Sequence, residues 1–135
     1  MKKTKVLDSF ALLAYLKKER NYQKVKEILI SCQKEQTELF LNEINVGEVY
    51  YILARERSLD AAEYFLNDIL PALGITIVPN SLADIIETAK IKARFPIAYA
   101  DAFAVATAAK YAAILVTGDH DFKQVAPLID IEWLT

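Results

Sequence analysis

The sequence predicts an α/β fold in which helices cover both faces of a parallel sheet. Short apolar runs of strand length alternate along the chain with longer segments whose apolar residues recur at helical spacing. This alternation favours right-handed β–α–β units, and such units build parallel sheets. A chain of 135 residues lies within the usual size of one domain. We therefore expect a single domain over residues 1–135.

The first half of the chain contains two of the predicted strands. The elements expected here are a strand at 5–7, helices at 9–18 and 21–34, and a strand at 39–41. Asn42 is a good N-cap residue for the helix that follows. The apolar stripe expected on that helix consists of Ile44, Val49, Ile52 and Leu53. Glu48 belongs to the same helix but lies off this stripe.

The second half contains three more predicted strands. The elements expected here are helices at 59–73, from Ser81 to about Phe95 and from Asp101 to about Tyr111, and strands at 75–78, 114–116 and 131–133. Gly74 follows the first of these helices, where glycine is favoured just past a helix end. Ser81 is placed to cap the second helix, and Pro96 interrupts the helical pattern after it. The third helix is rich in alanine.

Acidic residues stand at four points where distant segments of this fold should converge. They are Asp8, Glu48, Asp101 and Asp119. Three of the four follow a strand-like run or open a helix, and in a parallel sheet such positions gather at one edge. Crowded carboxylates repel one another, and a divalent cation such as Mg²⁺ removes that repulsion while leaving room for substrate phosphates. The pattern therefore predicts a metal site that acts on a phosphodiester.

Composition narrows the possible partners. The formal net charge is -2, so any contact with nucleic acid must be local, because a broad footprint needs a basic excess. The apolar fraction of 54% is generous for an isolated monomer and predicts an oligomer or a bound partner. Cys32 is the only cysteine, which favours a reducing compartment.

A membrane location is not expected. The chain starts like a signal peptide, with MKKTK before FALLAYL, but Asp8 interrupts the apolar region and no small-residue cleavage site follows. No apolar run approaches the roughly 18 residues that a membrane helix requires. We therefore expect a soluble cytoplasmic protein.

The motifs around the four acids resemble those of the PIN domains, and within them the VapC-type toxin ribonucleases of toxin–antitoxin pairs. VLDSFALLAYL resembles the first strand and acidic residue of that family, NVGEVYY its glutamate helix, and DAFAVATA followed by LVTGDHDF its two C-terminal motifs. The resemblance spans nearly the whole chain. Ser9 stands where many relatives have threonine, and this difference leaves the acidic set intact.

The resemblance implies both an architecture and a chemistry. It implies a three-layer α/β/α fold with five parallel strands in the order 3-2-1-4-5, so that Asp8 and Asp119 follow neighbouring strands. It also implies an endoribonuclease that depends on Mg²⁺ or Mn²⁺, with Asp8, Glu48, Asp101 and Asp119 holding the metal. The partners that it implies are an RNA substrate, a second copy of the chain in a homodimer, and a cognate antitoxin protein.

Each acid also has a purely structural interpretation. Asp8 is equally suited to cap the helix that follows it, and Asp101 near a helix start favours the helix dipole. Glu48 is also compatible with an ordinary solvated helix position, and Glu43 is the alternative to it. Gly47 suggests that backbone or ligand approaches closely beside Glu48, because glycine inside a helix costs up to about 1 kcal/mol relative to alanine.

Three further residues are weaker candidates for the site. Relatives share the T-x-D-x-D-F pattern that starts at Thr117. Three roles are open for its second aspartate, Asp121: it binds the metal, it supports a metal ligand, or it caps the turn after it. Thr117 and Asn45 are placed to donate hydrogen bonds to carboxylates, or else to fill ordinary strand-end and helix positions. Two other functions stay open: an RNA-processing PIN nuclease without a toxic role, and a PIN-like domain that binds RNA or protein without turnover.

Overall fold

Five parallel strands form one sheet in the order β3-β2-β1-β4-β5, in a computed structural model that describes residues 4–134. The strands are β1 (Lys5–Leu7), β2 (Leu39–Asn42), β3 (Thr76–Val78), β4 (Ile114–Thr117) and β5 (Ile131–Trp133). Each neighbouring pair is parallel. The predicted α/β fold and its strand order are confirmed. Residues 1–3, which begin the signal-like stretch, and Thr135 lie outside the described residues.

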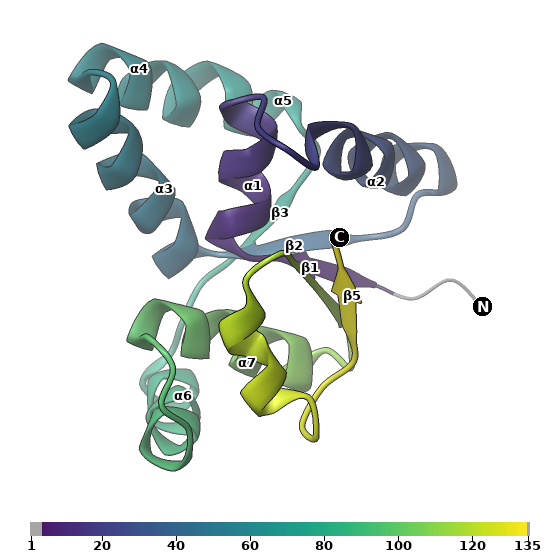
Figure 1. Cartoon of the computed structure of the whole chain (residues 1–135), viewed down its shortest axis with the longest axis vertical. Helices are drawn as coiled ribbons and strands as arrows, with labels where there is room; N and C mark the ends of the chain where they lie inside the picture. Colours follow the sequence, from purple (N-terminus) through teal and green to yellow (C-terminus); the bar gives the residue numbers. More distant parts are fainter. Residues whose placement is uncertain (1–3, 135) are drawn as a thin grey trace.

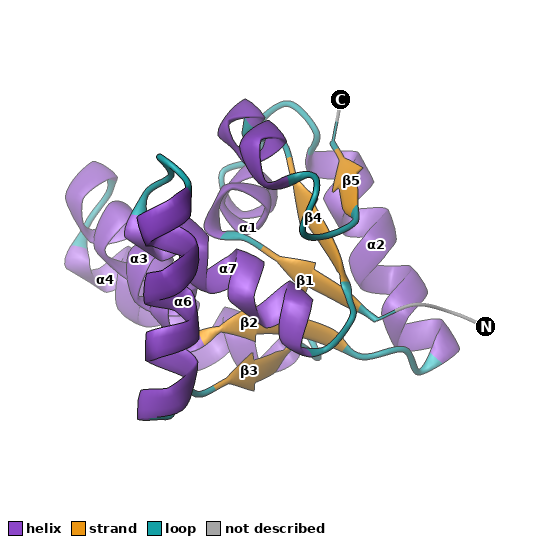
Figure 2. Ribbon diagram, turned by 90° about the horizontal axis from the view of Figure 1, so that it is seen from below, coloured by secondary structure: helices purple, strands orange, loops and turns teal. Residues whose placement is uncertain are grey.

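Helices cover both faces of this sheet. They are α1 (Ser9–Leu16), α2 (Tyr22–Glu35), α3 (Glu43–Glu56), α4 (Leu59–Tyr64), α5 (Leu70–Ala72), α6 (Leu82–Arg94) and α7 (Tyr99–Lys110). Figure 1 shows α1 to α5 on one side of the sheet and α6 and α7 on the other. In Figure 2, seen from below, α6 and α7 lie in front of the strands. A 3₁₀ segment, His120–Val125, follows β4.

Two apolar cores result, because successive residues of a strand point to opposite faces of the sheet. Leu7 and Val116 pack with residues of α1, α2 and α3 in one core. Their strand neighbours Val6 and Leu115 pack with the alanine-rich side of α7 in the other. The same alternation places Asp8, which directly follows Leu7, on the face that α7 covers.

The helix predicted over 59–73 contains an irregular turn. Its middle part, Phe65–Ile69, is π-helical and joins α4 to α5. Pro71 has no backbone N–H and cannot continue the normal hydrogen-bond ladder, which gives a physical reason for the local shift in pairing. Gly74 has a φ of 70°, the left-handed conformation that the sequence led us to expect just past a helix end.

The apolar stripe predicted for α3 is wrong at its first position, and the close approach of backbone considered beside Gly47 is also wrong. Ile44 is 39% exposed, because the inward position of the first turn is taken by Asn45, which is buried and bonds to α7. A Cβ on Gly47 would meet no other atom within 4 Å, so no close approach of the chain requires glycine there. Val49 and Leu53 are buried as predicted.

Within residues 4–134, no helix is both long enough and apolar enough to cross a membrane.

Candidate metal centre

Asp8 lies at the carboxyl end of β1 with only 1% of its surface exposed. Its Oδ1 accepts a hydrogen bond from the backbone N–H of Ala11 at 2.8 Å, so Asp8 caps α1. Its Oδ2 accepts a hydrogen bond from the hydroxyl of Thr117 at 2.5 Å. The structural interpretation of Asp8 as a helix cap is therefore correct, but the cap uses only one of the two carboxylate oxygens.

Thr117, the last residue of β4, connects Asp8 with Asp119. The hydroxyl that donates to Asp8 also accepts the backbone N–H of Asp119 at 3.0 Å. Asp119 in turn accepts the backbone N–H of Asp121 at 2.9 Å and so caps the 3₁₀ segment. The capping role considered for Asp121 thus belongs to Asp119, and Asp121 itself is exposed.

Glu48 reaches the same region from α3. Its Oε1 accepts the hydroxyl of Ser9 at 2.5 Å and lies 3.5 Å from the amide nitrogen of Asn45. Because Ser9 directly follows Asp8, this hydrogen bond holds Glu48 close to the end of β1. This role of Ser9 was not expected, because its only signal in the sequence is a hydroxyl residue beside the first acid.

Asn45 is completely buried between α3 and α7. Its amide nitrogen donates to the backbone carbonyl of Ala100 at 3.1 Å, directly before Asp101. Its Oδ1 has no hydrogen-bond partner among the described residues. A buried oxygen without a partner is unfavourable, and amide oxygens are among the groups that coordinate hard cations or the waters around them.

Asp101 enters the site from the first turn of α7, which begins at Tyr99 and not at Asp101 as predicted. The helix packs on the sheet through small buried side chains, among them Ala102, Ala104 and Ala108. These small residues let the helix lie close to the strands. Asp101 is partly exposed and faces the other acids closely enough to interact with their charges.

The acids from these segments act on one another electrostatically. Burial raises the pKa of Asp8 to about 7, and the charges of Asp101 and Asp119 add to the effect. Burial likewise raises the pKa of Asp101 to about 7, together with the charges of Glu48, Asp119 and Asp121. In the described part of the chain, no lysine or arginine forms an ion pair with any of these five acids.

The donor set suits a hard divalent cation, although the side chains do not form a finished cage. Among residues 4–134, no three aspartate, glutamate, histidine or cysteine side chains are grouped tightly enough to hold a metal ion as they stand. Internal hydrogen bonds hold Asp8, Glu48 and Asp119 instead. Their oxygen chemistry, their mutual repulsion and the unpartnered Oδ1 of Asn45 match what Mg²⁺ or Mn²⁺ binds. The residues therefore fit such an ion by charge and donor type.

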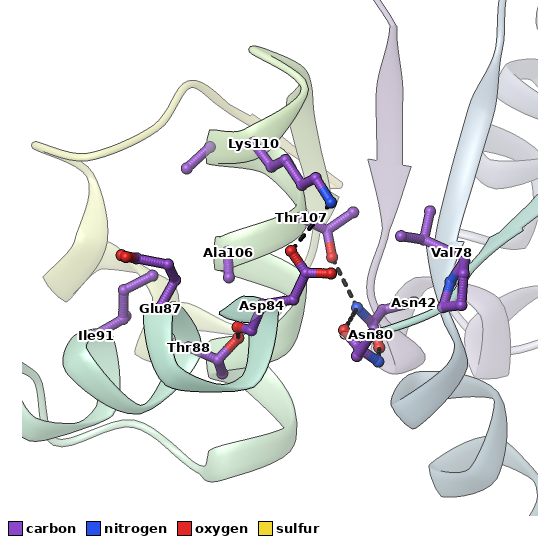
Figure 3. A pocket seen from close by; sticks show the side chains of 12 residues that line it. Asn42, Val78, Asn80, Asp84, Glu87, Thr88, Ile91, Ala106, Thr107 and Lys110 are labelled. Atoms are coloured by element: carbon purple, nitrogen blue, oxygen red, sulfur yellow. Dashed lines mark hydrogen bonds and ion pairs between the residues drawn. The ribbon is translucent and has the colours of Figure 1, made fainter. Parts of the chain in front are cut away.

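A separate cavity of about 380 Å³ lies near the ends of β2 and β3, beside α6 and α7 (Figure 3). Asn42 and Asn80 pair there through both side-chain amides, at 2.8 and 2.9 Å, and Asn42 also donates to Thr107. Glu43, the alternative to Glu48, accepts hydrogen bonds from Asn80 and so belongs to this network. The four predicted metal ligands do not line this cavity.

Comparison with solved structures finds the same fold in several toxin–antitoxin proteins. A DNA-bound VapBC from Salmonella typhimurium is similar with a TM-score of 0.75 and 14% identity, over 99% of this chain and 100% of that one. A VapC from Mycobacterium tuberculosis, described as a sarcin–ricin loop cleaving toxin, gives 0.74 and 14%, over 93% and 97%. FitAcB from Neisseria gonorrhoeae gives 0.68 and 23%, over 96% and 97%.

These identities are low, so the likeness to the solved structures concerns the fold. Comparison with curated protein sequences finds no match. The model of the PIN domain matches residues 5–128, a range that contains all four predicted metal ligands. The chain therefore belongs to the PIN domain family.

Proposed function

We propose that the protein is a single PIN nuclease domain that cleaves RNA phosphodiester bonds with the help of Mg²⁺ or Mn²⁺. The observation that carries the proposal is the electrostatic coupling of acids from four separate segments, none of which is paired with a described lysine or arginine. Acids with strongly shifted pKa values at the carboxyl edge of a parallel sheet are typical of a ligand site. Membership of the PIN domain family supports a nuclease.

The acids would hold the cation. Asp8, Glu48, Asp101 and Asp119 are the ligands that we assign, and Asp121 adds negative charge at the exposed rim. When bound, the ion would neutralise phosphate charge and make an attacking water more acidic.

Neighbouring side chains orient these ligands. The Ser9 hydroxyl holds Glu48, and the Thr117 hydroxyl holds Asp8 while it accepts the N–H of Asp119. Asn45 ties α3 to the first turn of α7 through the carbonyl of Ala100. The distances between the acids thus depend on hydrogen bonds between segments far apart in the sequence.

Proton transfer in this site falls to carboxylates and water. His120 is the only histidine, and its ring lies 6.1 Å from that of Trp133, nearly parallel to it. Burial raises the pKa of Asp8 and Asp101 to about 7 only while no cation is bound. As ligands they would stay ionised, so water at the ion would carry the proton away.

The test is cleavage of total RNA by the full chain in Mn²⁺ or in EDTA. We expect cleavage only with the metal, and at least about a hundredfold less cleavage by Asp101→Asn. Asp60→Asn is the matched control, because Asp60 is an exposed acid in the first turn of α4. If the wild-type protein leaves all RNA intact in Mn²⁺, the proposed activity is excluded. Single-stranded DNA in place of the RNA tests the preference for RNA.

We further propose that this nuclease is the toxin of a toxin–antitoxin pair. Proteins of the same fold include VapBC and FitAB, which are described in complexes bound to DNA fragments, and a toxin–antitoxin complex from Klebsiella pneumoniae. An antitoxin arginine or lysine would find acids here that no described cation of the chain already neutralises. Growth arrest on expression, relieved by a small gene directly upstream whose product co-purifies with the chain, is the expected result. Harmless expression would favour RNA processing instead.

A homodimer is the remaining part of the proposal. Several large apolar side chains are exposed, including Leu82 at 74% and Leu59 at 61%. Surface of this kind favours a second copy or another bound protein. Light scattering should give the mass of a dimer at tens of micromolar, and a monomer at that concentration would contradict it.

A further inference from the structure

An exposed aromatic ring lies beside the acidic site. Phe10 is the second residue of α1, two positions after Asp8, and it is 43% exposed. The residues around it in this helix, Ser9 and 11–14, are all buried. Phe10 itself belongs to neither apolar core. Single exposed apolar side chains are common on a folded surface, and Phe10 is set apart by its place two residues after Asp8 and its contact with the loop that carries Asp119.

The ring has a defined seat on the loop after β4. A Cβ on Gly118 would lie 2.5 Å from Cε1 and 3.2 Å from Cζ of Phe10, so the ring rests directly on the glycine backbone. The φ of Gly118 is not positive, so a side chain at this position would conflict only with the Phe10 ring, which would have to move. Gly118 stands between Thr117, which bonds to Asp8, and Asp119. The ring thus spans the two chain segments that supply Asp8 and Asp119.

We propose that Phe10 is a stacking platform for an unpaired RNA base next to the phosphate at the acidic site. The proposal rests on the ribonuclease function proposed above. Single-stranded RNA is held by positive charge along its backbone and by stacking of its bases on aromatic side chains. Positive charge is scarce here, because the chain has a net charge of -2 and the site is a cluster of acids. Stacking on Phe10 provides attraction that the acids cannot provide.

The binding experiment uses a single-stranded RNA of about twelve nucleotides that carries 2-aminopurine, a length within the range such sites contact. The experiment uses the full chain with Asp101→Asn, which should bind this RNA and cut it at least about a hundredfold more slowly. Phe10→Leu removes the ring and keeps an apolar side chain, and it should weaken binding about tenfold and abolish the change in 2-aminopurine fluorescence that accompanies stacking on the ring. Phe10→Trp should preserve both. Tyr64→Leu is the matched control, because Tyr64 is 60% exposed on α4, and it should change neither.

Gly118→Ala disrupts the same contact from the other side. The new methyl group pushes the ring from its seat without removing it, so RNA binding should weaken as it does in Phe10→Leu. The double variant should bind no worse than Phe10→Leu alone, because the ring that Gly118 supports is already absent. If the losses of RNA binding in the two single variants add up in the double variant, the packing of the ring on Gly118 is not what supports RNA binding. The melting shift produced by Mn²⁺ should survive Phe10→Leu, which separates base stacking from damage to the acids.

The outcomes distinguish this inference from the function on which it rests. If the wild-type chain neither binds nor cleaves RNA, both the nuclease function and the stacking platform are wrong. The second outcome is that the wild-type chain cleaves RNA, but Phe10→Leu binds the RNA as tightly as its parent and gives the same fluorescence change. In that case only the stacking platform is wrong.

Discussion

Asp8 and Asn42 occupy equivalent positions at the ends of neighbouring strands. The register of β1 and β2 brings them to the same level of the sheet. Each caps the helix that follows it: Asp8 accepts the N–H of Ala11 at 2.8 Å, and Asn42 accepts the N–H of Ile44 at 2.9 Å. Both are buried, with 1% and 2% of their surface exposed. They differ in that one can carry a charge and the other cannot.

This difference separates capping from function. Asparagine and aspartate cap helices about equally well, and Asn42 satisfies its amide with the neutral partners Asn80 and Thr107. Asp8 places a carboxylate in a similar site, where burial raises its pKa to about 7. A buried charge without a cation is unfavourable. Capping alone would therefore favour asparagine at position 8, and binding of a cation supplies a reason for the aspartate.

The largest effect that this comparison predicts is on stability against pH without metal. The pKa of Asp8 rises from an ordinary 3.8 to about 7, so between these values the folded chain holds a proton that the unfolded chain has lost. Stability should fall as pH rises from about 4 to about 7, and above that range the ionised group should cost about 4 kcal/mol. In EDTA at pH 8, Asp8→Asn should melt higher than wild type, with a flatter dependence on pH.

Asn42→Asp is the mirror-image control for that experiment. It places a carboxylate at the equivalent cap and removes the donors to Asn80 and Thr107, so it should be less stable at pH 8 than at pH 5. An Asp8→Asn protein that melts well below wild type at pH 8 would show that the charge of Asp8 has a structural partner.

The second prediction concerns turnover. Asp8→Asn and Asp119→Asn should each reduce RNA cleavage at least about a hundredfold, because each removes one of the charges assigned to the metal. Glu48→Gln should act in the same direction. Circular dichroism checks that α1 and the sheet are intact, as the retained cap predicts for Asp8→Asn. Cleavage near the wild-type rate by any one of these variants would remove that residue from the ligand set.

The third prediction is the stabilisation that a metal provides. At a hundredfold excess of Mn²⁺ over its dissociation constant, the free energy of unfolding of the wild-type chain should rise by about 2.7 kcal/mol. Asp8→Asn and Asp101→Asn should gain much less, and Asp60→Asn should gain as much as wild type. Thermal melts at neutral pH with EDTA or Mn²⁺ measure the difference. An equal gain in wild type and Asp101→Asn would refute Asp101 as a ligand.

The sequence predicts the fold more completely than it predicts the details of the site. Alternating strands and helices predict the parallel sheet, and acids at strand ends and helix starts predict where they gather. The contacts that adjust the site join residues far apart in the sequence: Ser9 bonds to Glu48 across 39 positions, and Phe10 packs on Gly118. Neither pair leaves a periodic signal, because only the folded chain brings its two members together. The π-helical turn before Pro71 was missed for a different reason: the apolar spacing of this segment is that of a helix and does not distinguish π from α pairing.

The smallest predicted effect compares Gly47 with Gly118. The sequence suggested that Gly47 leaves room for something close to Glu48, but its missing Cβ faces open space. Gly47→Ala should therefore raise the free energy of unfolding by about 0.5 to 1 kcal/mol, because alanine is the better residue inside a helix. RNA cleavage should be unchanged. At Gly118 the same substitution collides with Phe10 and should weaken RNA binding instead. Urea denaturation and kcat/KM measured on both alanine variants test the contrast. A loss of kcat/KM in Gly47→Ala, without a loss of stability, would mean that RNA or a partner approaches α3 beside Glu48 as the sequence first suggested.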